Sequence, residues 1–404
     1  MSHEARISEV PNPGVLKDAG PLKVVGFTAL CTGVAAFCVQ YVLDSNLAWA
    51  SYLQGFFYAL CLGLAGAVFV AINNLANSVW IMPFRRICES MTAILPWTVV
   101  LIIPILLASG TIYEWADHEA SHLYGTKAAY LSIGFWSLRI VGFLIVMAYF
   151  TGFFRSISQA QDTHKQGLNV VGKSAGFLIL FGFGFTLFSV DLLMSLRPHW
   201  FSTMYGVYCF AGLLQAGFCV MILTTIYLRE KGYLEGILKD RHLFDLGTWL
   251  LAWCTFMAYI GFSQFMLIWY ANLPEETPFF IDHLYEQWGV LYVIIFTVKW
   301  VIPFFVLMPK PFRKNHLVLK VMCTAILLIE WVDIYWMVFP EFIRFFGLDG
   351  LRGTAFSGHF LLSFLVGMGF LGAFILAMVK FLSKNSVVPI GEPKLLSSVN
   401  GDYL

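Results

Sequence analysis

Long runs of apolar residues alternate with short polar segments along almost the whole chain. Ten of these runs reach about 18 residues, the length that an apolar helix needs to cross the hydrocarbon core of a bilayer. They are residues 22–43, 48–75, 92–109, 129–153, 175–196, 204–228, 243–271, 288–308, 317–339 and 355–382. This pattern predicts an all-α, polytopic membrane protein with about ten transmembrane helices, each bounded to within a few residues.

The composition agrees, and the charges give an orientation. The 404 residues are 59% hydrophobic and 12% charged, against roughly 45–50% apolar and about 25% charged in an average soluble domain. Lys and Arg gather in both tails and in the loops after the second, fourth, sixth and eighth runs. The remaining loops hold only Lys127, Arg197, Arg344 and Arg352. Because cytoplasmic loops carry the excess of basic residues, both termini are expected to be cytoplasmic. The first 21 residues are polar, so no cleavable signal peptide is expected.

Cysteine and histidine usage argues against a redox cofactor in this chain. The eight Cys residues form no CxxC pair, and nearly all lie in apolar runs, where a thiol is usually a small core residue. Of the nine His residues only His359 lies clearly inside a run, so facing ligands for a membrane haem are not expected. Neither GxGxxG nor a GxxxxGK phosphate loop occurs. We therefore expect no bound cofactor, no metal and no nucleic-acid partner.

One short motif matches a zinc signature. His118, Glu119 and His122 spell HEASH, which fits the HExxH of zinc hydrolases. That chemistry needs a third ligand, and this segment lies in a polar outer loop where none is evident. An acidic loop is the preferred interpretation. Acidic outer loops of this kind, with Glu275 and Glu276 in another, either dock partner subunits or are simply solvated.

Four ionisable residues lie where lipid normally demands a hydrocarbon side chain. Arg139 and Asp191 are in the fourth and fifth runs, and Lys299 and Asp333 are in the eighth and ninth. A lone charge near the bilayer centre costs roughly 2.5–3.5 kcal/mol, so each base is expected to pair with the acid on the next helix. Helix rise places the partners at similar depths in the outer half of the membrane. Such pairs either clamp helices together or handle protons.

The surroundings of the two pairs indicate an internal repeat. Segments 189–198 (SVDLLMSLRP) and 331–340 (WVDIYWMVFP) share V-D, six residues and P, and each base lies between a Ser or Thr two residues earlier and a Val two residues later. The copies lie four helices apart and keep one orientation, as in parallel repeats. We expect two four-helix bundles, helices 2–5 and 6–9, flanked by helices 1 and 10. The corresponding segments are a tail 1–21, a helix 22–43, units 44–197 and 198–346, a helix 347–384 and a tail 385–404. Both tails are expected to be loosely ordered.

Glu330 distinguishes the second pair from the first. It precedes Asp333 by three residues, so both carboxylates lie on about the same helix face. One Lys cannot neutralise two carboxylates, which suits a proton relay. Tyr335, Ser263, Gln264 and Tyr292 are candidates to extend such a path, although for each one alone a packing role is the preferred interpretation.

Four longer segments resemble a known family. They are MPFRRICESM (82–91), SVDLLMSLRPHWFSTMYGVYCFAG (189–212), WYANLPEETPFF (269–280) and EWVDIYWMVFP (330–340). In this order they are similar to segments of the ActF membrane subunits of alternative complex III, which belong to the NrfD or polysulfide-reductase type. The similarity runs from about Leu22 to Pro393. In that family the positions of Lys299 and Glu330 are often His, and the position of Arg197 is more commonly Glu.

The resemblance implies a role in a bacterial quinol:cytochrome c oxidoreductase. Its implied partners are a multihaem cytochrome c, an iron–sulfur subunit, a sister NrfD-like membrane subunit, small membrane subunits and lipids. Haem c and iron–sulfur clusters are then expected in the partners, and a quinol or menaquinol site in the sister subunit. The implied location is the bacterial inner membrane. This chain is then expected to do no redox chemistry itself but to support proton translocation through Glu330, Asp333 and Lys299, with Arg139 and Asp191 as a second pair.

A secondary transporter is the alternative function. Parallel repeats with charges near the midplane also serve alternating access. Against this interpretation, no run is broken by paired Gly and Pro at matching places in both units.

Overall fold

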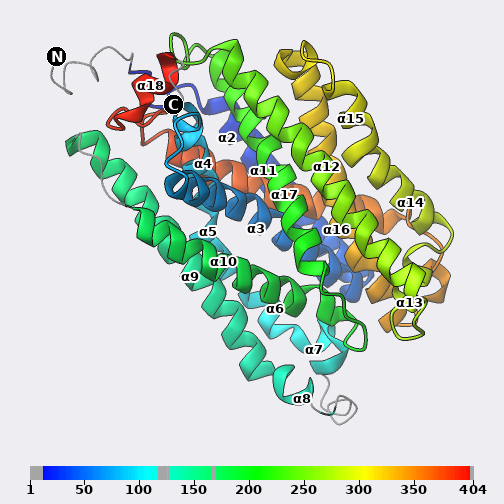
Figure 1. Cartoon of the computed structure of the whole chain (residues 1–404). Helices are drawn as coiled ribbons and strands as arrows, with labels where there is room; N and C mark the ends of the chain where they lie inside the picture. The colour runs from blue at the N-terminus through cyan, green and yellow to red at the C-terminus, as the bar shows by residue number, and fades with distance from the viewer. Residues whose placement is uncertain (1–11, 117–124, 126, 165–169, 401–404) are drawn as a thin grey trace.

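The computed structural model describes residues 12–116, 125, 127–164 and 170–400. Regular structure in these residues is helical (Figure 1). Nine helical stretches in them are long and apolar enough to cross a membrane. These are Gly20–Leu43 (α2), Ser45–Leu75 (α3), Met82–Leu107 (η1 to α6), Ile133–Thr163 (within α9, Ile133–His164), Val171–Leu196 (α10, Val171–Leu192, with η5, Met194–Leu196), Tyr205–Glu230 (α11), Asp240–Ala271 (α12), Gln287–Leu307 (α14 to α15) and Gly358–Leu382 (α17). The protein is therefore an all-α polytopic membrane protein, as predicted.

The ninth predicted run lies in one further long helix, α16 (His316–Phe345). Its buried face carries Glu330, Asp333 and Glu341 among apolar residues. The total of ten transmembrane helices and their division into two bundles stay predictions. Short helices connect the long ones. They are α8 (Lys127–Tyr130), α13 (Thr277–His283), η3 (Glu114–Ala116), η7 (Phe312–Lys314) and η8 (Asp349–Leu351).

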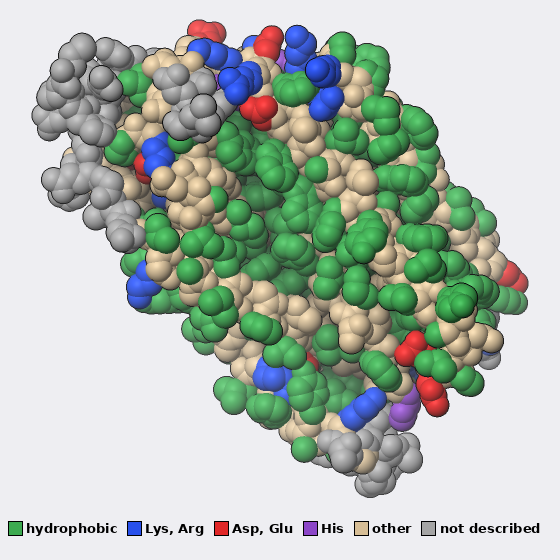
Figure 2. Space-filling view, viewed as in Figure 1, with side chains coloured by type: hydrophobic (Ala, Val, Ile, Leu, Met, Phe, Trp, Pro, Cys, Tyr) green, Lys and Arg blue, Asp and Glu red, His purple; other side chains and the backbone are tan. Residues whose placement is uncertain are grey.

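The long helices run between two ends of the molecule. At the end that we call the tail end, the Leu16 N–H donates to the Leu382 carbonyl at 3.0 Å, so the segment before α2 meets the end of α17. At the opposite, far end, Arg344 of α16 pairs with Glu114 at 3.3 Å. Figure 2 shows hydrophobic side chains over the face between the two ends and charged side chains gathered near them. This distribution fits a lipid-facing belt between two polar surfaces.

Helix α3 lies at the centre of the fold, and almost all of its residues are buried. It contacts α4, α10, α11, α16 and α17. A helix that is apolar on every side is stable only when it is surrounded in this way. Helix α2, by contrast, buries only a narrow stripe that includes Gly26 and Gly33, and most of its other apolar residues are exposed.

One of the long helical stretches, Met82–Leu107, is divided into short pieces, and proline is the cause. The predicted run 92–109 begins earlier and divides into η1 (Met82–Phe84), α4 (Arg85–Met91), η2 (Thr92–Ile94), α5 (Leu95–Leu101), α6 (Ile103–Leu107) and α7 (Ser109–Ile112). Pro83, Pro96 and Pro104 lie at the first positions of three of these pieces. Each proline lacks an N–H and crowds the carbonyl four residues earlier, so a continuous helix is not formed.

The expectation of loosely ordered tails is wrong for the described residues. Val387 and Val388 are fully buried, and α18 (Lys394–Asn400) follows them. Leu16 and Ala19 are buried before α2. These apolar residues among prolines and serines cover the tail end of the helices, a contribution that composition alone does not reveal.

Helices α2 and α17 approach each other through glycine. A Cβ added at Gly369 would lie 2.8 Å from the Gly33 Cα. We expect Gly369→Ala to separate the two helices and to lower stability by about 1–3 kcal/mol, the usual cost of overpacking. Unfolding of the purified protein in mild detergent measures this. Gly176→Ala in α10 is the control, because a Cβ there meets nothing within 4 Å. Equal stability of the two variants would contradict the close approach.

Candidate functional site

The structure brings Lys299, Glu330 and Asp333 together in the protein interior. The Lys299 Nζ lies 2.6 Å from Asp333 Oδ2 and 2.5 Å from Glu330 Oε2. The three residues are 2%, 6% and 1% exposed, respectively. The predicted pairing of Lys299 with Asp333 is therefore confirmed, and Glu330 shares the same ammonium group. We refer to these three residues as the Lys299 triad.

A break in helical geometry positions Lys299. Residues Thr297–Val301 form a π-helical turn (η6) between α14 (Gln287–Phe296) and α15 (Ile302–Leu307). In an α-helix the Lys299 carbonyl would accept the N–H of residue 303, but that residue is Pro303 and has none. The Gln215 amide of α11 supplies the missing donor at 2.8 Å. Turns of this kind often mark functional positions.

Helix α11 also makes room for the carboxylates. The Glu330 carboxylate lies against the backbone of Gly212, where a Cβ would collide with it. One turn away, the Tyr208 hydroxyl donates to Asp333, with distances of 2.8 and 2.9 Å to its two oxygens. Sequence reasoning missed Tyr208, because nothing in the spacing of polar residues indicates which face of α11 meets α16.

The structure does not bring Tyr335 to the triad. Its hydroxyl donates to the Ala355 carbonyl at 3.1 Å, and its ring stacks on Trp288 and Trp331. Tyr335 lies only two residues after Asp333, so it points to another face of α16. Its predicted place in a proton path has no support in these contacts, which are those of a packing residue.

One small cavity lies beside the triad, and a second shares Tyr208 and Tyr292 with it. The first, of about 20 Å³, is lined by Lys299, Tyr208 and Tyr292 among others. The second, of about 10 Å³, is lined by Tyr205, Tyr208, Gln264 and Tyr292 among others. Each is comparable to the space that one water molecule needs, and each has polar groups in its wall. Of the residues expected to extend the path, Tyr292 lines both cavities and Gln264 lines the second, whereas Ser263 lines neither.

Arg139 and Asp191 form a second pair with different surroundings. The guanidinium donates to both Asp191 oxygens at 2.8 Å and to the Tyr130 carbonyl at 3.0 Å. It also lies over the rings of Tyr130 and Phe135, at 3.8 and 4.4 Å from their centroids. One cation here meets one carboxylate, and each of its three nitrogens donates a hydrogen bond. The pair is confirmed, and its geometry is that of a helix clamp.

A charged network at the far end includes Glu341 and Arg344 of α16, the helix that carries Glu330 and Asp333 of the triad. Glu341 pairs with Arg344 at 2.9 Å and with Arg197 at 3.3 Å. Arg197 also pairs with Asp282 at 3.0 Å, and the buried His283 has its Nδ1 3.8 Å from Glu341. Two acids of the outer loops, Glu114 and Asp282, are therefore compensated within this chain.

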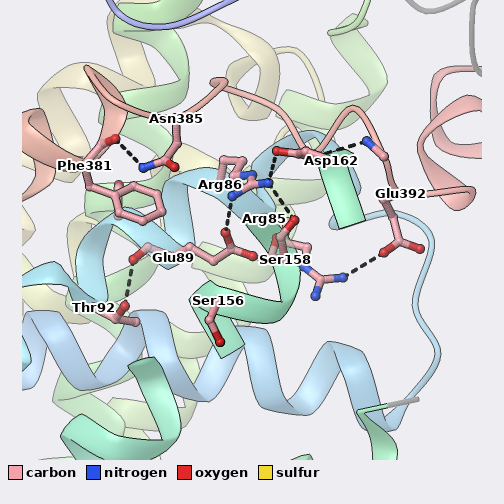
Figure 3. Close-up of polar contacts among 12 residues, drawn as sticks. Arg85, Arg86, Glu89, Thr92, Ser156, Ser158, Asp162, Phe381, Asn385 and Glu392 are labelled. Atoms are coloured by element: carbon pink, nitrogen blue, oxygen red, sulfur yellow. Dashed lines mark hydrogen bonds and ion pairs between the residues drawn. The ribbon is translucent and has the colours of Figure 1, made fainter. Parts of the chain in front are cut away.

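A third network, at the tail end, uses the motif MPFRRICESM (Figure 3). Arg85 and Arg86 both pair with Glu89, at 3.1 and 3.2 Å, and Arg86 also pairs with Asp162 of α9. Arg85 reaches Glu392 of the C-terminal segment at 3.1 Å. Glu89 and both arginines are buried, so these contacts tie α4, α9 and the C-terminal segment together. Spacing within the motif suggests the Arg–Glu contacts, but only the fold supplies Asp162 and Glu392.

The described residues contain no group of three or more His, Cys, Asp or Glu side chains arranged to hold a metal ion. The HEASH segment, with His118, Glu119 and His122, lies outside the described residues.

No family model matches the chain, and no curated protein matches it significantly. Fold and site together define a class, a multi-pass α-helical membrane protein with a buried Lys–Glu–Asp triad. Its more particular role is a matter for proposal.

We expect the Arg139–Asp191 pair to stabilise the fold. Asp191→Leu leaves a partly buried guanidinium without its carboxylate, so it should cost up to about 3 kcal/mol. The double variant Arg139→Met/Asp191→Leu removes both charges and should recover most of that loss. Denaturant titration in detergent gives the two free energies of unfolding. If both variants lose the same stability, the two side chains are not coupled.

His283 predicts a pH dependence of stability. Burial lowers the pKa of His283 below its ordinary value of 6.5, against the opposing effect of Glu341. The unfolded chain therefore binds a proton before the folded chain does, so this contribution is complete above about pH 6.5 and is lost as the pH falls below it. We expect His283→Gln to flatten the decline of melting temperature between about pH 6.5 and 5. An unchanged slope would show that His283 is not the group responsible.

Proposed function

We propose that this chain is a membrane subunit of a respiratory quinol oxidoreductase of the alternative complex III type, in which it supports proton movement coupled to quinol oxidation. The observation that carries the proton role is the Lys299 triad, one ammonium group bonded to two buried carboxylates. The similarity of the four segments to ActF supports the kind of complex. Its electrons are handled by partner subunits that carry haem c and iron–sulfur clusters.

The charge balance of the triad gives the proton step. With both acids ionised, the triad has one excess negative charge in an apolar interior, which attracts a proton strongly. Protonation of Glu330 leaves Lys299 and Asp333 as a balanced pair. Loss of that proton restores the excess charge and the affinity for the next one. The triad thus alternates between two states of similar geometry that differ by one proton.

The residues around the triad suggest a route toward the far end. The Tyr208 hydroxyl both donates and accepts protons, and it already contacts Asp333. The two small cavities continue from Tyr208 past Tyr292 to Tyr205 and Gln264. Bound water in them would connect these groups by hydrogen bonds. A proton moved across the membrane against 100 mV needs about 2.3 kcal/mol, which electron transfer in the partner subunits supplies.

The proposed assembly and orientation follow the family likeness and the basic loops. The chain lies in the bacterial inner membrane with both termini in the cytoplasm, so the tail end is cytoplasmic. Its partners are a multihaem cytochrome c, an iron–sulfur subunit, a sister membrane subunit that binds quinol, and small membrane subunits.

We expect Glu330→Gln to leave assembly and quinol oxidation intact but to lower the number of protons translocated per electron. The amide keeps the shape of the side chain but cannot accept and release the proton. Tyr208→Phe should act in the same direction, because it removes the donor to Asp333. Tyr335→Phe is the matched control, since its hydroxyl contacts Ala355 instead. Reconstituted liposomes with a pH-sensitive dye give the proton yield.

Two results would contradict this proposal, one for the proton relay and the other for the complex. An unchanged proton yield in a fully assembled Glu330→Gln complex would remove the relay but leave the complex. Purification of the chain in mild detergent tests for its partners. If it is obtained alone, without c-type haem, and exchanges a solute in liposomes, the protein is a secondary transporter and not a subunit of a respiratory complex.

A further inference from the structure

A surface groove at the tail end lies between α2 and α17. Its cavity volume is about 660 Å³. The α2 side is formed by Lys23, Val24, Phe27 and Thr28, and the α17 side continues through Leu376, Lys380, Ser383 and Lys384. The groove is separate from the Lys299 triad, and none of its residues takes part in the proposed proton route.

Positive charge surrounds the polar part of the groove. Lys23, Lys380 and Lys384 are exposed and have no ion pair with any residue that the structure describes. The Ser383 Oγ is buried without a hydrogen-bond partner. Helix α2 begins here with no side-chain cap and no acid in its first turn, so its positive dipole end adds to the lysines. An anion fits this place, and no carboxylate among the described residues occupies it.

The rest of the groove is apolar and faces the lipid belt. Val24 and Phe27 are 63% and 61% exposed, and Leu376 faces them from α17. An occupant therefore needs an anionic group at the tail end and hydrocarbon that extends along the helices. A free phosphate ion satisfies only the first requirement, and a neutral lipid only the second.

A neighbouring cavity differs from the groove because no charged residue lines it. Between α17 and the α11–α16 pair lies an apolar space of about 460 Å³ that contains no charged residue in its wall. Its wall offers no charge to a lipid headgroup. The three lysines are thus particular to the α2–α17 groove.

We propose that the α2–α17 groove binds one anionic diacyl phospholipid, with its phosphate held by Lys23, Lys380 and Lys384 and an acyl chain along Val24, Phe27 and Leu376. Basic pockets between transmembrane helices at the cytoplasmic side bind anionic headgroups in this way. The bound lipid fills the gap beside α2, the long helix with the fewest buried residues, and so holds it against α17.

The test is native mass spectrometry of the full-length protein, delipidated in mild detergent and titrated with phosphatidylglycerol or phosphatidylcholine of equal chain length. We expect one phosphatidylglycerol to bind in preference to phosphatidylcholine. Lys23→Gln/Lys380→Gln/Lys384→Gln should weaken that binding by about 100-fold, since each lysine near an anionic headgroup contributes on the order of a factor of five. The matched control, Lys173→Gln/Lys310→Gln/Lys314→Gln, removes the same charge elsewhere at the tail end and should retain the lipid.

Further arms distinguish the other possibilities. The triple Lys→Arg variant at Lys23, Lys380 and Lys384 keeps the charge and should keep the lipid. If the triple Lys→Gln variant does not fold, each single Lys→Gln variant should weaken lipid binding by part of the full effect. Equal binding of both lipids, or equal loss in the control variant, would overturn the proposal. Displacement of the lipid by inorganic phosphate at millimolar concentration would also overturn it, because the site would then recognise a small anion. None of these readouts depends on proton translocation or on partner subunits.

Discussion

The structure depends on one constraint, which is that a charge placed in an apolar interior must meet an opposite charge there. Each isolated charge would cost roughly 2.5–3.5 kcal/mol at the bilayer centre. Arg139, Asp191, Lys299 and Asp333 satisfy the constraint in pairs that join α9 to α10 and the α14–α15 segment to α16. The register of these helices is fixed by the need to bring the partners together, in addition to apolar packing that on its own tolerates small shifts.

The two pairs satisfy the constraint to different degrees, and this difference separates support from candidate chemistry. Arg139 is surrounded by acceptors and aromatic rings, so a change of its charge state would disrupt several contacts at once. Lys299 has two carboxylates, one of which is redundant for neutrality. The proposed relay rests on this surplus acid, because its protonation leaves one intact ion pair. The same layout of base and acid on consecutive helices thus has one carboxylate per base in one half of the chain and two in the other.

Sequence predicted the features that follow from local chemistry. The apolar runs gave the long helices, and the cost of lone charges gave both ion pairs. It did not predict Tyr208, Gln215 or Gly212, because their importance depends on which face of α11 meets α16, and α11 is buried nearly all round. Tyr335 is a predicted member of the proton path, but it follows Asp333 by two residues, and that spacing turns its side chain to another face of the helix. Glu392 lay in a segment that composition marks as a tail, and only burial against α4 reveals its partner.

The ion pair between Arg85 and Glu392 has a consequence for biosynthesis. The two residues are 307 positions apart, so the ribosome must add most of the membrane domain before the second acid partner of Arg85 exists. Until then Arg85 has only Glu89, which it shares with Arg86. Helix α4 is thus inserted before Arg85 has its second carboxylate partner, and the ion pair with Glu392 of the C-terminal segment then stabilises α4. The charged network at the tail end is therefore complete only after the C-terminal segment has been synthesised.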